Sequence, residues 1–453
     1  MNPSLILINP WIYDFAAYDL WSKPLGLLYL ASHLRSCGFQ IHLIDCLDVH
    51  HPGMKDDVSV RQPVRRHYGT GKFQKQKTLK LSPLEDIPRP YYRYGIPRRL
   101  FIKELMKIRK PSAILVTSLM TYWYPGVRDA ISLAKEIHPN VPVILGGIYA
   151  RLCTQHALQS SGADHVVDEV YFNKPASILN ILDQFDITIP EALATNHESP
   201  YPAFDLLHSI DYISLLTSTG CPYRCRYCAS HFLYPRISRR DPFEVLEEII
   251  YWHRQYGIKD FAFYDDALLI ESNSHITVLL ENLLKQNLNL RFHTPNALHV
   301  REITPDISRL LYLSGFRTIR LGYETSDMNL HIALDKKVSE GEFERGVLNL
   351  KRAGFTGREA GVYILMGLPG QSVESVIRTI KHVGRIGATP FLAEYSPIPN
   401  TPLWKEALSN SRYDLASEPL FHNNTLMPCW DIDRIKKIPV LKKMIMKIRQ
   451  NLS

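Results

Sequence analysis

The sequence contains few long apolar runs. None of its stretches approaches the ~18 uninterrupted apolar residues that a membrane-spanning helix needs. The opening residues, MNPSLILINPW, have no basic group ahead of their short apolar run, so they do not fit a secretory signal. We therefore expect a cytoplasmic protein without a membrane span.

Cysteine is also scarce, and its number is odd. Seven cysteines in 453 residues, without a signal peptide, argue against a disulfide framework. The composition, 45% hydrophobic and 22% charged, excludes wholesale disorder and a fibrous fold. The length predicts two or three domains rather than one compact core.

Positive charge is concentrated in one segment. Residues 55–110 hold 16 Lys and Arg against 5 Asp and Glu, whereas the formal net charge of the whole chain is +8. We expect a solvated, partly extended insertion there, because the segment also carries five prolines. A nucleic acid or another polyanion is the alternative partner for this segment.

The first part of the chain alternates between strand and helix patterns. Short apolar runs at 5–9, 40–45, 113–118 and 141–145 predict strands, and 24–35 and 126–137 predict helices. This order is typical of a parallel sheet with crossover helices. We expect an α/β fold whose first domain, residues 1–183, is a doubly wound (Rossmann-like) parallel sheet carrying the basic insertion at 55–110.

The alternation restarts after a Pro- and Ala-rich stretch at 184–208, which we interpret as a linker. Six strand patterns, at 212–217, 260–264, 290–294, 317–322, 359–366 and 391–395, have helical segments between them. They predict a partial (β/α)6 TIM-type barrel over residues 209–400, with its site at the carboxyl ends of the strands. The short extension 401–453 has no clear strand, and we expect it to be mostly helical, with an amphipathic helix at 434–449 packed on the barrel.

The strongest local signal is STGCPYRCRYCAS, directly after the first barrel strand. Cys221, Cys225 and Cys228 have the spacing C-x3-C-x2-C, and thiolates are soft ligands that select iron–sulfur clusters or zinc. Three cysteines on one loop can hold three corners of a cubane and leave one iron open. Two alternatives remain: a structural zinc with His231, or an electron-transfer cluster completed by a remote cysteine.

The triplet, with Tyr227 just before its third cysteine, resembles the motif of the radical SAM superfamily. The resemblance covers roughly residues 212–400. It implies a 4Fe-4S cluster whose open iron chelates S-adenosylmethionine (SAM), and reductive cleavage of SAM to a 5′-deoxyadenosyl radical. The three cysteines would then be both the metal ligands and the core of the catalytic site.

Acidic and amide residues downstream match further motifs of this family. FAFYDD is similar to the motif that ends the second strand, which implies that Asp265 and Asp266 contact the SAM ammonium group. A carboxylate pairs well with that cation. Asn296, in HTPNALH, follows the third strand and would face the same mouth. The alternatives are a helix cap for the aspartates and a turn for Asn296.

Two later motifs extend the resemblance. RLGYET is similar to the end of the fourth strand, which implies Glu324 near the SAM hydroxyls with Arg320 beside it; the alternative is an ion pair between the two. YILMGLPGQS resembles the fifth-strand glycine motif, in which Gly367 and Gly370 let the backbone approach the adenine. Gln371 replaces an acidic residue common at its position.

The first domain resembles the cobalamin-binding module of cobalamin-dependent radical SAM enzymes. LGGIYA matches the glycine pair of that module at Gly146 and Gly147, and SLMT matches the preceding strand end at Ser118. A nicotinamide-binding domain is the competing interpretation, but NPWIYD after the first strand contains no glycine. Asp48, His50 and Gly53 form a D-x-H-x-x-G pattern, although it follows the second strand, so we interpret His50 as a loop histidine rather than a cobalt ligand.

These patterns predict a radical SAM enzyme. With cobalamin bound, the expected reaction is methyl transfer to an unactivated carbon; without it, a radical rearrangement or cyclisation is equally open. A nucleic-acid-binding protein with a structural metal is the hypothesis from another class. The resemblance implies a reductant such as flavodoxin or ferredoxin, and a small molecule or peptide as substrate.

Overall fold

The computed structural model describes residues 2–55, 62–168, 177–190 and 201–452. They form two compact units, each described here by itself. The first comprises residues 1–211 with 418–420, and the second comprises residues 212–417 with 421–453. None of the described helices is long and apolar enough to cross a membrane.

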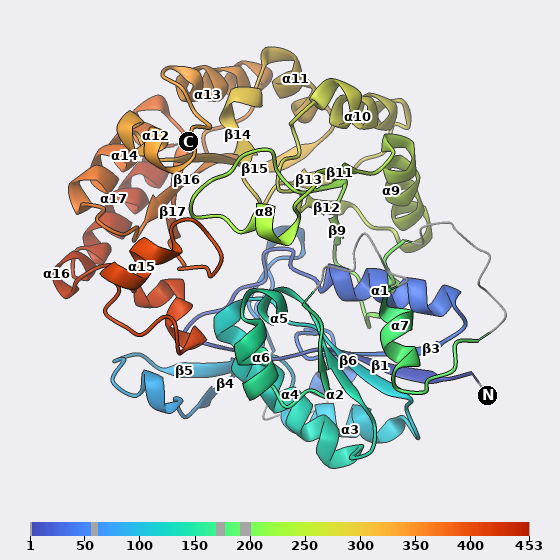
Figure 1. Ribbon diagram of the computed structural model, residues 1–453. Helices are drawn as coiled ribbons and strands as arrows, with labels where there is room; N and C mark the ends of the chain where they lie inside the picture. The colour runs from blue at the N-terminus through green and yellow to red at the C-terminus, as the bar shows by residue number, and fades with distance from the viewer. Residues whose placement is uncertain (1, 56–61, 169–176, 191–200, 453) are drawn as a thin grey trace. The chain divides into compact units, whose positions relative to one another are not determined.

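A five-stranded parallel sheet forms the centre of the first unit (Figure 1). Its strands are β1 (Ser4–Asn9), β3 (Gln40–Asp45), β6 (Ala113–Val116), β7 (Val143–Leu145) and β8 (His165–Val166). Their order across the sheet is β3-β1-β6-β7-β8. Numbered along the chain this is 2-1-3-4-5, the flavodoxin-like doubly wound order, so the expected fold of this unit is confirmed.

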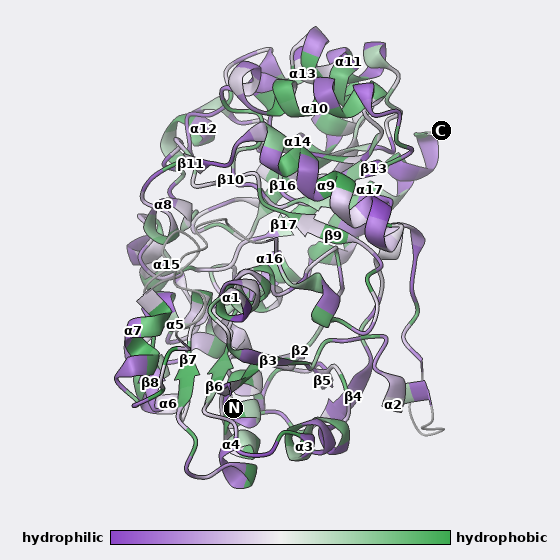
Figure 2. Cartoon of the chain, turned by 90° about the vertical axis from the view of Figure 1, so that its right-hand side faces the viewer, coloured by the Kyte–Doolittle hydropathy of each residue, from purple (hydrophilic) through white to green (hydrophobic). Residues whose placement is uncertain are grey.

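Apolar strand residues explain why this sheet forms. β6 and β7 are buried along their whole length and appear as hydrophobic in Figure 2, as expected for strands covered on both faces. Helices surround them: α1 (Leu25–Ser36), α4 (Tyr124–Ile137), α5 (Ile148–Leu152), α6 (Thr154–Ser160) and α7 (Ser177–Asp183). In this order ligands bind beyond the carboxyl ends of the strands, where the strand order reverses beside β1.

The described part of the basic segment is largely exposed or half-buried and partly extended, and it also contains regular secondary structure. It holds β4 (Lys75–Thr78), β5 (Tyr91–Tyr94) and α3 (Arg98–Lys107), and α2 (Pro52–Lys55) directly precedes it. β5 pairs antiparallel with both β4 and β2 (Ile12–Asp14), and α3 packs against α4. Buried aromatic rings, among them Tyr91 and Phe101, supply the apolar surface that this small sheet needs.

The described ends of the expected linker belong to the first unit. Ile187 and Ala203 are buried in its core cluster, and Ala203 N donates to Leu28 O at 3.0 Å. A short 3-10 helix (Phe204–Leu206) follows. The unit therefore extends to residue 211, and residues 191–200 lie outside the described part of the chain.

Six parallel strands in chain order form the second unit. They are β9 (Ile213–Leu215), β12 (Asp260–Phe263), β13 (Arg291–His293), β15 (Phe316–Glu324), β16 (Ala360–Met366) and β17 (Thr389–Glu394). A short strand β14 (Leu298–His299) also pairs with β15. Strands that succeed one another without reversal curl into a barrel, so the predicted partial barrel is confirmed.

Helices form the outer layer of this barrel (Figure 1). They are α9 (Pro242–Tyr256), α10 (Ile276–Lys285), α11 (Pro305–Leu313), α12 (Met328–Leu334), α13 (Glu342–Ala353) and α14 (Val373–Ile386). Their ends follow local signals. Asp241 caps α9 by accepting from Phe243 N at 2.7 Å, and Gly257 ends it in a left-handed conformation with φ +69°.

The C-terminal extension is part of the second unit. It holds α15 (Trp404–Asn410), α16 (Ile432–Ile435) and α17 (Ile438–Asn451), and no strand among its described residues. α17 packs on β17 and α14 through the buried residues Leu441 and Ile445. The structure therefore confirms the amphipathic helix expected at the end of the chain.

Candidate active site

The three cysteines of the C-x3-C-x2-C motif lie on one loop beyond the carboxyl end of β9. The chain enters this loop through β10 (Ser218–Thr219), which pairs antiparallel with β11 (Ser238–Arg239). Two backbone bonds then fix the loop: Cys228 N donates to Cys225 O at 3.1 Å, and Arg226 N donates to Leu334 O at 2.8 Å. The triplet thus occupies the end of the barrel where active sites are found.

Burial keeps the three thiols protonated in the metal-free chain. It raises the pKa of Cys221 to about 11 and that of Cys225 to about 12, and it also raises the pKa of Cys228. A thiolate at Cys228 adds to the shift of the other two, so the three sulfurs share one electrostatic environment. A soft metal centre that binds them must therefore displace their protons.

The donors near the triplet bear on whether it could hold a single metal ion. Among the described residues, no three His, Cys, Asp or Glu side chains lie close enough to hold a single metal ion. A zinc site of the triplet with His231 is therefore not assembled. The thiolates of a cubane bind different irons and lie farther apart than the ligands of one ion, so this finding does not exclude a cluster held at three corners. Cys429 is buried in an apolar cluster, with Ala407 O 3.9 Å from its sulfur.

Asp265 and Asp266 lie at the carboxyl end of β12, and both bond to the cysteine loop. Asp265 Oδ1 accepts from Thr217 Oγ1 at 2.7 Å and from Ser218 Oγ at 2.6 Å. Asp266 Oδ2 accepts from Ser230 Oγ at 2.5 Å. Burial raises the pKa of both carboxyls. Asp265 is buried, whereas Asp266 is half-buried and a ligand can reach it. Of the two aspartates, we therefore expect Asp266 to contact the SAM ammonium group.

Glu324 ends β15, and its partner is not the expected arginine. Its Oε1 lies 2.8 Å from Lys337 Nζ. Arg320 lies over the ring of Phe391, 4.4 Å from its centroid, and donates to Ile319 O at 2.9 Å. The alternative of an Arg320–Glu324 ion pair is therefore wrong, because residues four apart in a strand are roughly 13 Å apart even when they share a face. Glu324 has a φ of +65°, an uncommon conformation for a non-glycine residue that is concentrated at functional sites.

Lys337 joins this strand end to the cysteine loop. Its Nζ donates to Tyr227 OH at 2.8 Å, and Tyr227 OH donates to Asp335 Oδ2 at 3.2 Å. The pKa of Lys337 is raised: burial lowers it, but the nearby acidic groups, Glu324 foremost, outweigh that effect. Sequence reasoning missed this lysine, because ALDKKV has no motif and lysines in loops are usually solvated.

Asn296 bonds to a neighbouring strand end, and the glycine motif is closed by Gln371. Asn296 Nδ2 donates to Tyr264 O at 2.7 Å, so its side chain is fixed at the carboxyl end of β12 and not within its own turn. Gln371 Oε1 accepts from Gly367 N at 2.9 Å, so the residue that departs from the family pattern closes the turn. Gly367 and Gly370 have φ of +101° and +69°, conformations that favour glycine. A Cβ on Gly370 would meet no described atom within 4 Å, so its backbone stays open to an approaching group.

His299 lies against the first cysteine of the triplet. Its Nε2 is 3.9 Å from Cys221 Sγ, and the ring of Tyr223 stacks on it with the centroids 4.7 Å apart. Burial, and then the charge of Lys337, lower the pKa of His299 to about 3, so the imidazole is neutral. No described residue offers a hydrogen-bond partner to its buried Nδ1.

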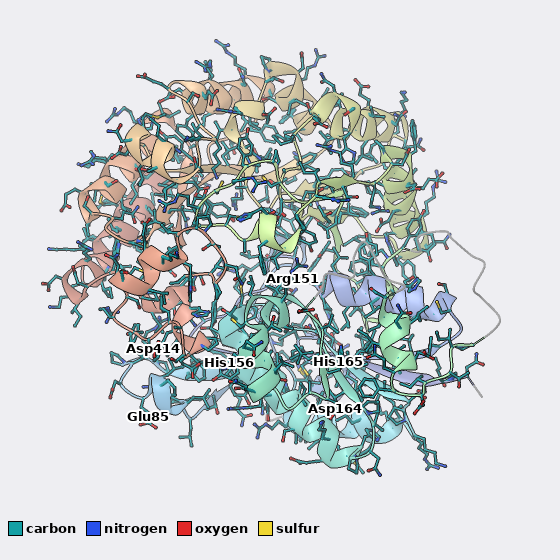
Figure 3. The ribbon with its side chains drawn as sticks, in the orientation of Figure 1. Glu85, Arg151, His156, Asp164, His165 and Asp414 are labelled. Carbon is teal, nitrogen blue, oxygen red and sulfur yellow. The ribbon has the colours of Figure 1, made fainter. Side chains whose placement is uncertain are left out.

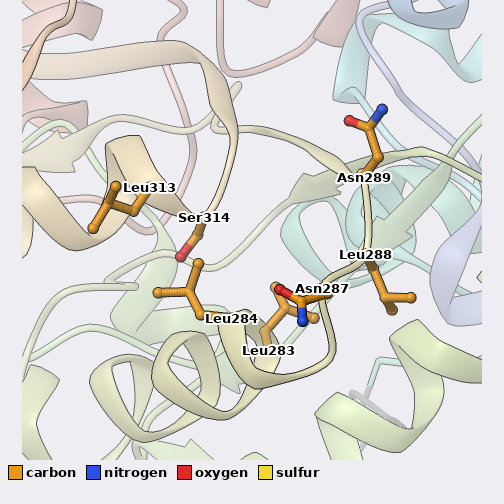
Figure 4. A pocket seen from close by; sticks show the side chains of 7 residues that line it. All are labelled: Leu283, Leu284, Asn287, Leu288, Asn289, Leu313 and Ser314. Atoms are coloured by element: carbon orange, nitrogen blue, oxygen red, sulfur yellow. The ribbon is translucent and has the colours of Figure 1, made fainter.

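A separate cavity of about 280 Å³ lies at the opposite end of the strands (Figure 4). Leu288 and Asn289 line it just before β13, and Leu313 and Ser314 line it just before β15. Barrel enzymes place their chemistry at the carboxyl ends of the strands, and this cavity is at the amino ends. It is therefore not part of the candidate active site.

The carboxyl ends of β6 and β7 carry the residues expected from the first-domain resemblance. Ser118 Oγ donates to Gly146 O at 2.7 Å, which joins the two strand ends. Gly147 has a φ of +98°, and a Cβ there would lie 2.2 Å from Ser118 O. A Cβ on Gly146 would meet nothing nearer than Val167 Cβ at 3.8 Å, so packing within the chain does not require glycine at that position.

Histidines of the first unit, His156 and His50, have hydrogen-bond partners within the chain. His156 on α6, labelled in Figure 3, pairs its Nδ1 with Tyr149 OH at 2.7 Å. His50 pairs its Nε2 with Asp211 Oδ2 at 2.7 Å, and Asp48 accepts from His208 Nδ1 at 2.6 Å. The aspartate and the histidine of the D-x-H-x-x-G pattern thus have partners within the unit, in agreement with the loop-histidine interpretation.

The sequence of the second unit matches a known family. Residues 215–383, from β9 to α14, match the model of the radical SAM superfamily. The second unit contains a radical SAM domain. The resemblance expected from the cysteine spacing is therefore confirmed, and with it the 4Fe-4S cluster and SAM as the cofactors of the domain.

Relatives of this chain include methyltransferases. It is 24% identical to an uncharacterized methyltransferase of Pyrococcus horikoshii, over 70% of this chain and 74% of that protein. It is 21% identical to the cytidylyl-2-hydroxyethylphosphonate methyltransferase of Streptomyces wedmorensis, over 90% and 82% respectively.

Solved structures show the same fold. The radical SAM methyltransferase TsrM of Kitasatospora setae matches with a TM-score of 0.65 at 16% identity, covering 96% of this chain and 84% of that chain. The cobalamin-dependent SAM radical enzyme OxsB matches with a TM-score of 0.57 at 14% identity, covering 98% and 56%.

Proposed function

We propose that this enzyme is a cobalamin-dependent radical SAM methyltransferase that acts on an unactivated carbon. Cys221, Cys225 and Cys228 are the cluster ligands in this proposal. The observation that carries it is a flavodoxin-like α/β unit ahead of a radical SAM barrel in one chain. The methyltransferase relatives, which span most of the chain, support it.

When bound, a cluster held by Cys221, Cys225 and Cys228 would supply the electron for reductive cleavage of SAM, and cobalamin in the first unit would supply a carrier for the methyl group. The protein chain would position the reacting groups and shield the radical from water. The loop bonds of Asp265 and Asp266 fix the cysteines, and Asp266 offers a carboxylate to the SAM ammonium group. Glu324 faces the ribose hydroxyls, and Gly370 gives the adenine access to the backbone.

The first unit would hold cobalamin at the carboxyl ends of β6 and β7. Gly146 leaves open space that a ligand can use, and Ser118 fixes its carbonyl. Leu119 and Met120 directly follow and are 40% and 43% exposed, so they offer apolar surface to a corrin edge. His50 pairs with Asp211, so the proposal takes no histidine as a cobalt ligand.

The partners follow from the chemistry. We propose flavodoxin or ferredoxin as the electron donor, the cytoplasm as the place of action, and a small molecule or peptide as the substrate. A nucleic acid is not favoured, because cations of the basic segment have partners within the unit: Arg65 lies 2.7 Å from Asp19, and Arg98 lies 2.7 Å from Asp129.

Anaerobic reconstitution tests the proposal. The full chain is supplied with iron, sulfide and hydroxocobalamin, reduced with dithionite and given SAM. We expect 5′-deoxyadenosine, S-adenosylhomocysteine and the absorption spectrum of methylcobalamin. Cys225→Ala should lose the cluster absorption and 5′-deoxyadenosine, whereas Cys429→Ala should keep both, because Cys429 lies in an apolar cluster. Equal losses in the two variants, or no 5′-deoxyadenosine from the wild type, would contradict it.

A cyclase is the second candidate. The chain is 22% identical to the anaerobic magnesium-protoporphyrin IX monomethyl ester cyclase of Rubrivivax gelatinosus, over 62% of this chain and 55% of that protein. The same experiment separates the two functions. A methyltransferase forms S-adenosylhomocysteine together with methylcobalamin, whereas radical chemistry without methyl transfer yields 5′-deoxyadenosine alone.

A further inference from the structure

A buried ion pair adjoins the cysteine loop. Lys337 and Glu324 are 7% and 6% exposed, and their Nζ and Oε1 atoms are 2.8 Å apart. Lys337 also donates to Tyr227 OH at 2.8 Å and lies 3.9 Å from Asp335 Oδ2. A lysine is rarely this buried unless it is paired, because removing its charge from water is unfavourable.

The charges of this group are not balanced. One ammonium group faces two carboxylates, those of Glu324 and Asp335, and the imidazole of His331 bonds Asp335 Oδ1 at 3.2 Å. Lys337 is the cation of this group that bonds to the cysteine loop, through Tyr227 OH at 2.8 Å.

Tyr227 links the lysine to the triplet. It lies between Cys225 and Cys228 in the sequence, and its hydroxyl bonds both Lys337 Nζ and Asp335 Oδ2. The lysine also lies 5.5 Å from the centroid of the Tyr227 ring, within cation–π range. Lys337 is thereby fixed to the loop itself and not only to the end of β15.

We propose that Lys337 is a positioning residue that favours the reduced form of the cluster, with Glu324 opposing it. The inference rests on the proposed cluster ligands. A cubane with three thiolates carries one negative charge when oxidised and two when it has accepted an electron. A fixed cation stabilises the more negative state, and a fixed anion destabilises it.

Redox titrations of the reconstituted full chain test this role. The midpoint potential of the cluster is followed by electron paramagnetic resonance without SAM, so the readout does not depend on turnover. Lys337→Met should make reduction about tenfold less favourable, a shift of about 59 mV to more negative potential for one electron. Lys337→Arg keeps the charge and should stay close to the wild-type potential.

Two carboxylate variants distinguish charge from packing. Glu324→Gln removes the opposing anion and should move the potential to more positive values. Glu248→Gln is the matched control, because Glu248 is also buried in the second unit and is paired with Arg240 at 2.6 Å. It should leave the potential unchanged. If the Lys337–Glu324 pair were only structural, both Lys337→Met and Glu324→Gln would lose cluster, and their midpoint potentials would not shift in opposite directions.

The outcomes separate this inference from the proposed function. If the wild type assembles the cluster and neither Lys337→Met nor Glu324→Gln moves its potential, the role of Lys337 is refuted and the proposed function stands. If the wild type and all variants fail to assemble a cluster, the proposed function fails. If Lys337→Met alone fails to fold, a positive shift in Glu324→Gln supports the inference and its absence overturns it.

Discussion

Asp265 and Asp266 are neighbours in the sequence, and their carboxylates hold opposite ends of the cysteine loop. Asp265 bonds Thr217 and Ser218, which precede the triplet, and Asp266 bonds Ser230, which follows it. The end of β12 therefore fixes the span of the loop between its first and last cysteine. His275 adds to the fixation, because its Nε2 lies 2.8 Å from Thr217 Oγ1.

This relationship predicts that Asp265→Asn lowers the iron content of the reconstituted chain severalfold. An amide cannot accept two hydroxyl hydrogen bonds and the backbone N–H of Thr217 equally well, and each buried bond lost costs about 1–3 kcal/mol. Iron and sulfide per chain are the measurement. The matched control is Glu248→Gln, which removes another buried carboxylate of the barrel. A full cluster in Asp265→Asn would show that this carboxylate does not fix the loop.

Asp266→Asn should behave differently. Its amide can still accept from Ser230, so the cluster should assemble, but the charge offered to the SAM ammonium group is lost. A hydrogen bond to a charged group is worth about 1.5–3 kcal/mol, so the Kd for SAM should rise roughly tenfold or more. Calorimetric titration of SAM into the reconstituted chain measures it. An unchanged Kd would leave Asp266 with the same fixing role as Asp265.

Much of the barrel could be predicted because its patterns are local. Helix α14 lies where a helical segment was expected between the fifth and sixth strand patterns, and it follows the capping residue Ser372 and ends before Gly387. β4 has the sequence KQKT, with no buried residue, so no periodicity marks it. It forms because β5 offers it a pairing edge. Tertiary pairing of this kind leaves no signal in the strand itself.

The residues of the candidate site also differ in how well the sequence predicts them. The spacing of the cysteines identified the loop, because three thiols on a short segment carry their chemistry in the sequence. The partner of Glu324 could not be found from the sequence. Arg320, the partner considered from the sequence, lies on the same strand as Glu324. Lys337, the partner in the structure, comes from the loop between α12 and α13. Contacts across elements depend on how the elements pack, and the spacing of residues along one strand does not contain that information.

The ion pair of Asp48 with His208 makes the first unit sensitive to pH. The bond to Asp48 raises the pKa of His208 above its ordinary 6.5. Burial raises the pKa of Asp48, but the bonds from His208 and from the backbone N–H of His50, with the charges of His208 and Lys23, together lower it below 3.8. The pair therefore makes its full contribution to the stability of the folded unit between pH 3.8 and pH 6.5, the ordinary pKa values of Asp48 and His208. Its contribution is lost as the pH rises through the folded pKa of His208, or falls through that of Asp48.

His208→Gln should remove this dependence. The gap in Tm between wild type and variant should be larger at pH 6 than at pH 8.5, by an amount that corresponds to about 1 kcal/mol or less, because the His208 side chain is 44% exposed. Thermal unfolding followed by circular dichroism at the two pH values gives the comparison. A difference in Tm that is larger at pH 8.5 than at pH 6 would contradict stabilisation by the protonated form of His208.

The open space beside Gly146 gives the sharpest test of the first unit. Gly146→Ala adds a methyl group that meets no described atom nearer than 3.8 Å, so the fold should tolerate it. If a corrin's nucleotide tail passes there, the methyl group occupies its path, and bound cobalamin should fall at least tenfold by absorbance after gel filtration. Gly26→Ala is the matched control: Gly26 also has no neighbour within 4 Å of an added Cβ, and it lies in α1. Equal cobalamin content in the two variants would remove Gly146 from the site, whereas a loss in Gly146→Ala alone, with an unchanged Tm, would leave steric exclusion of the ligand as its cause.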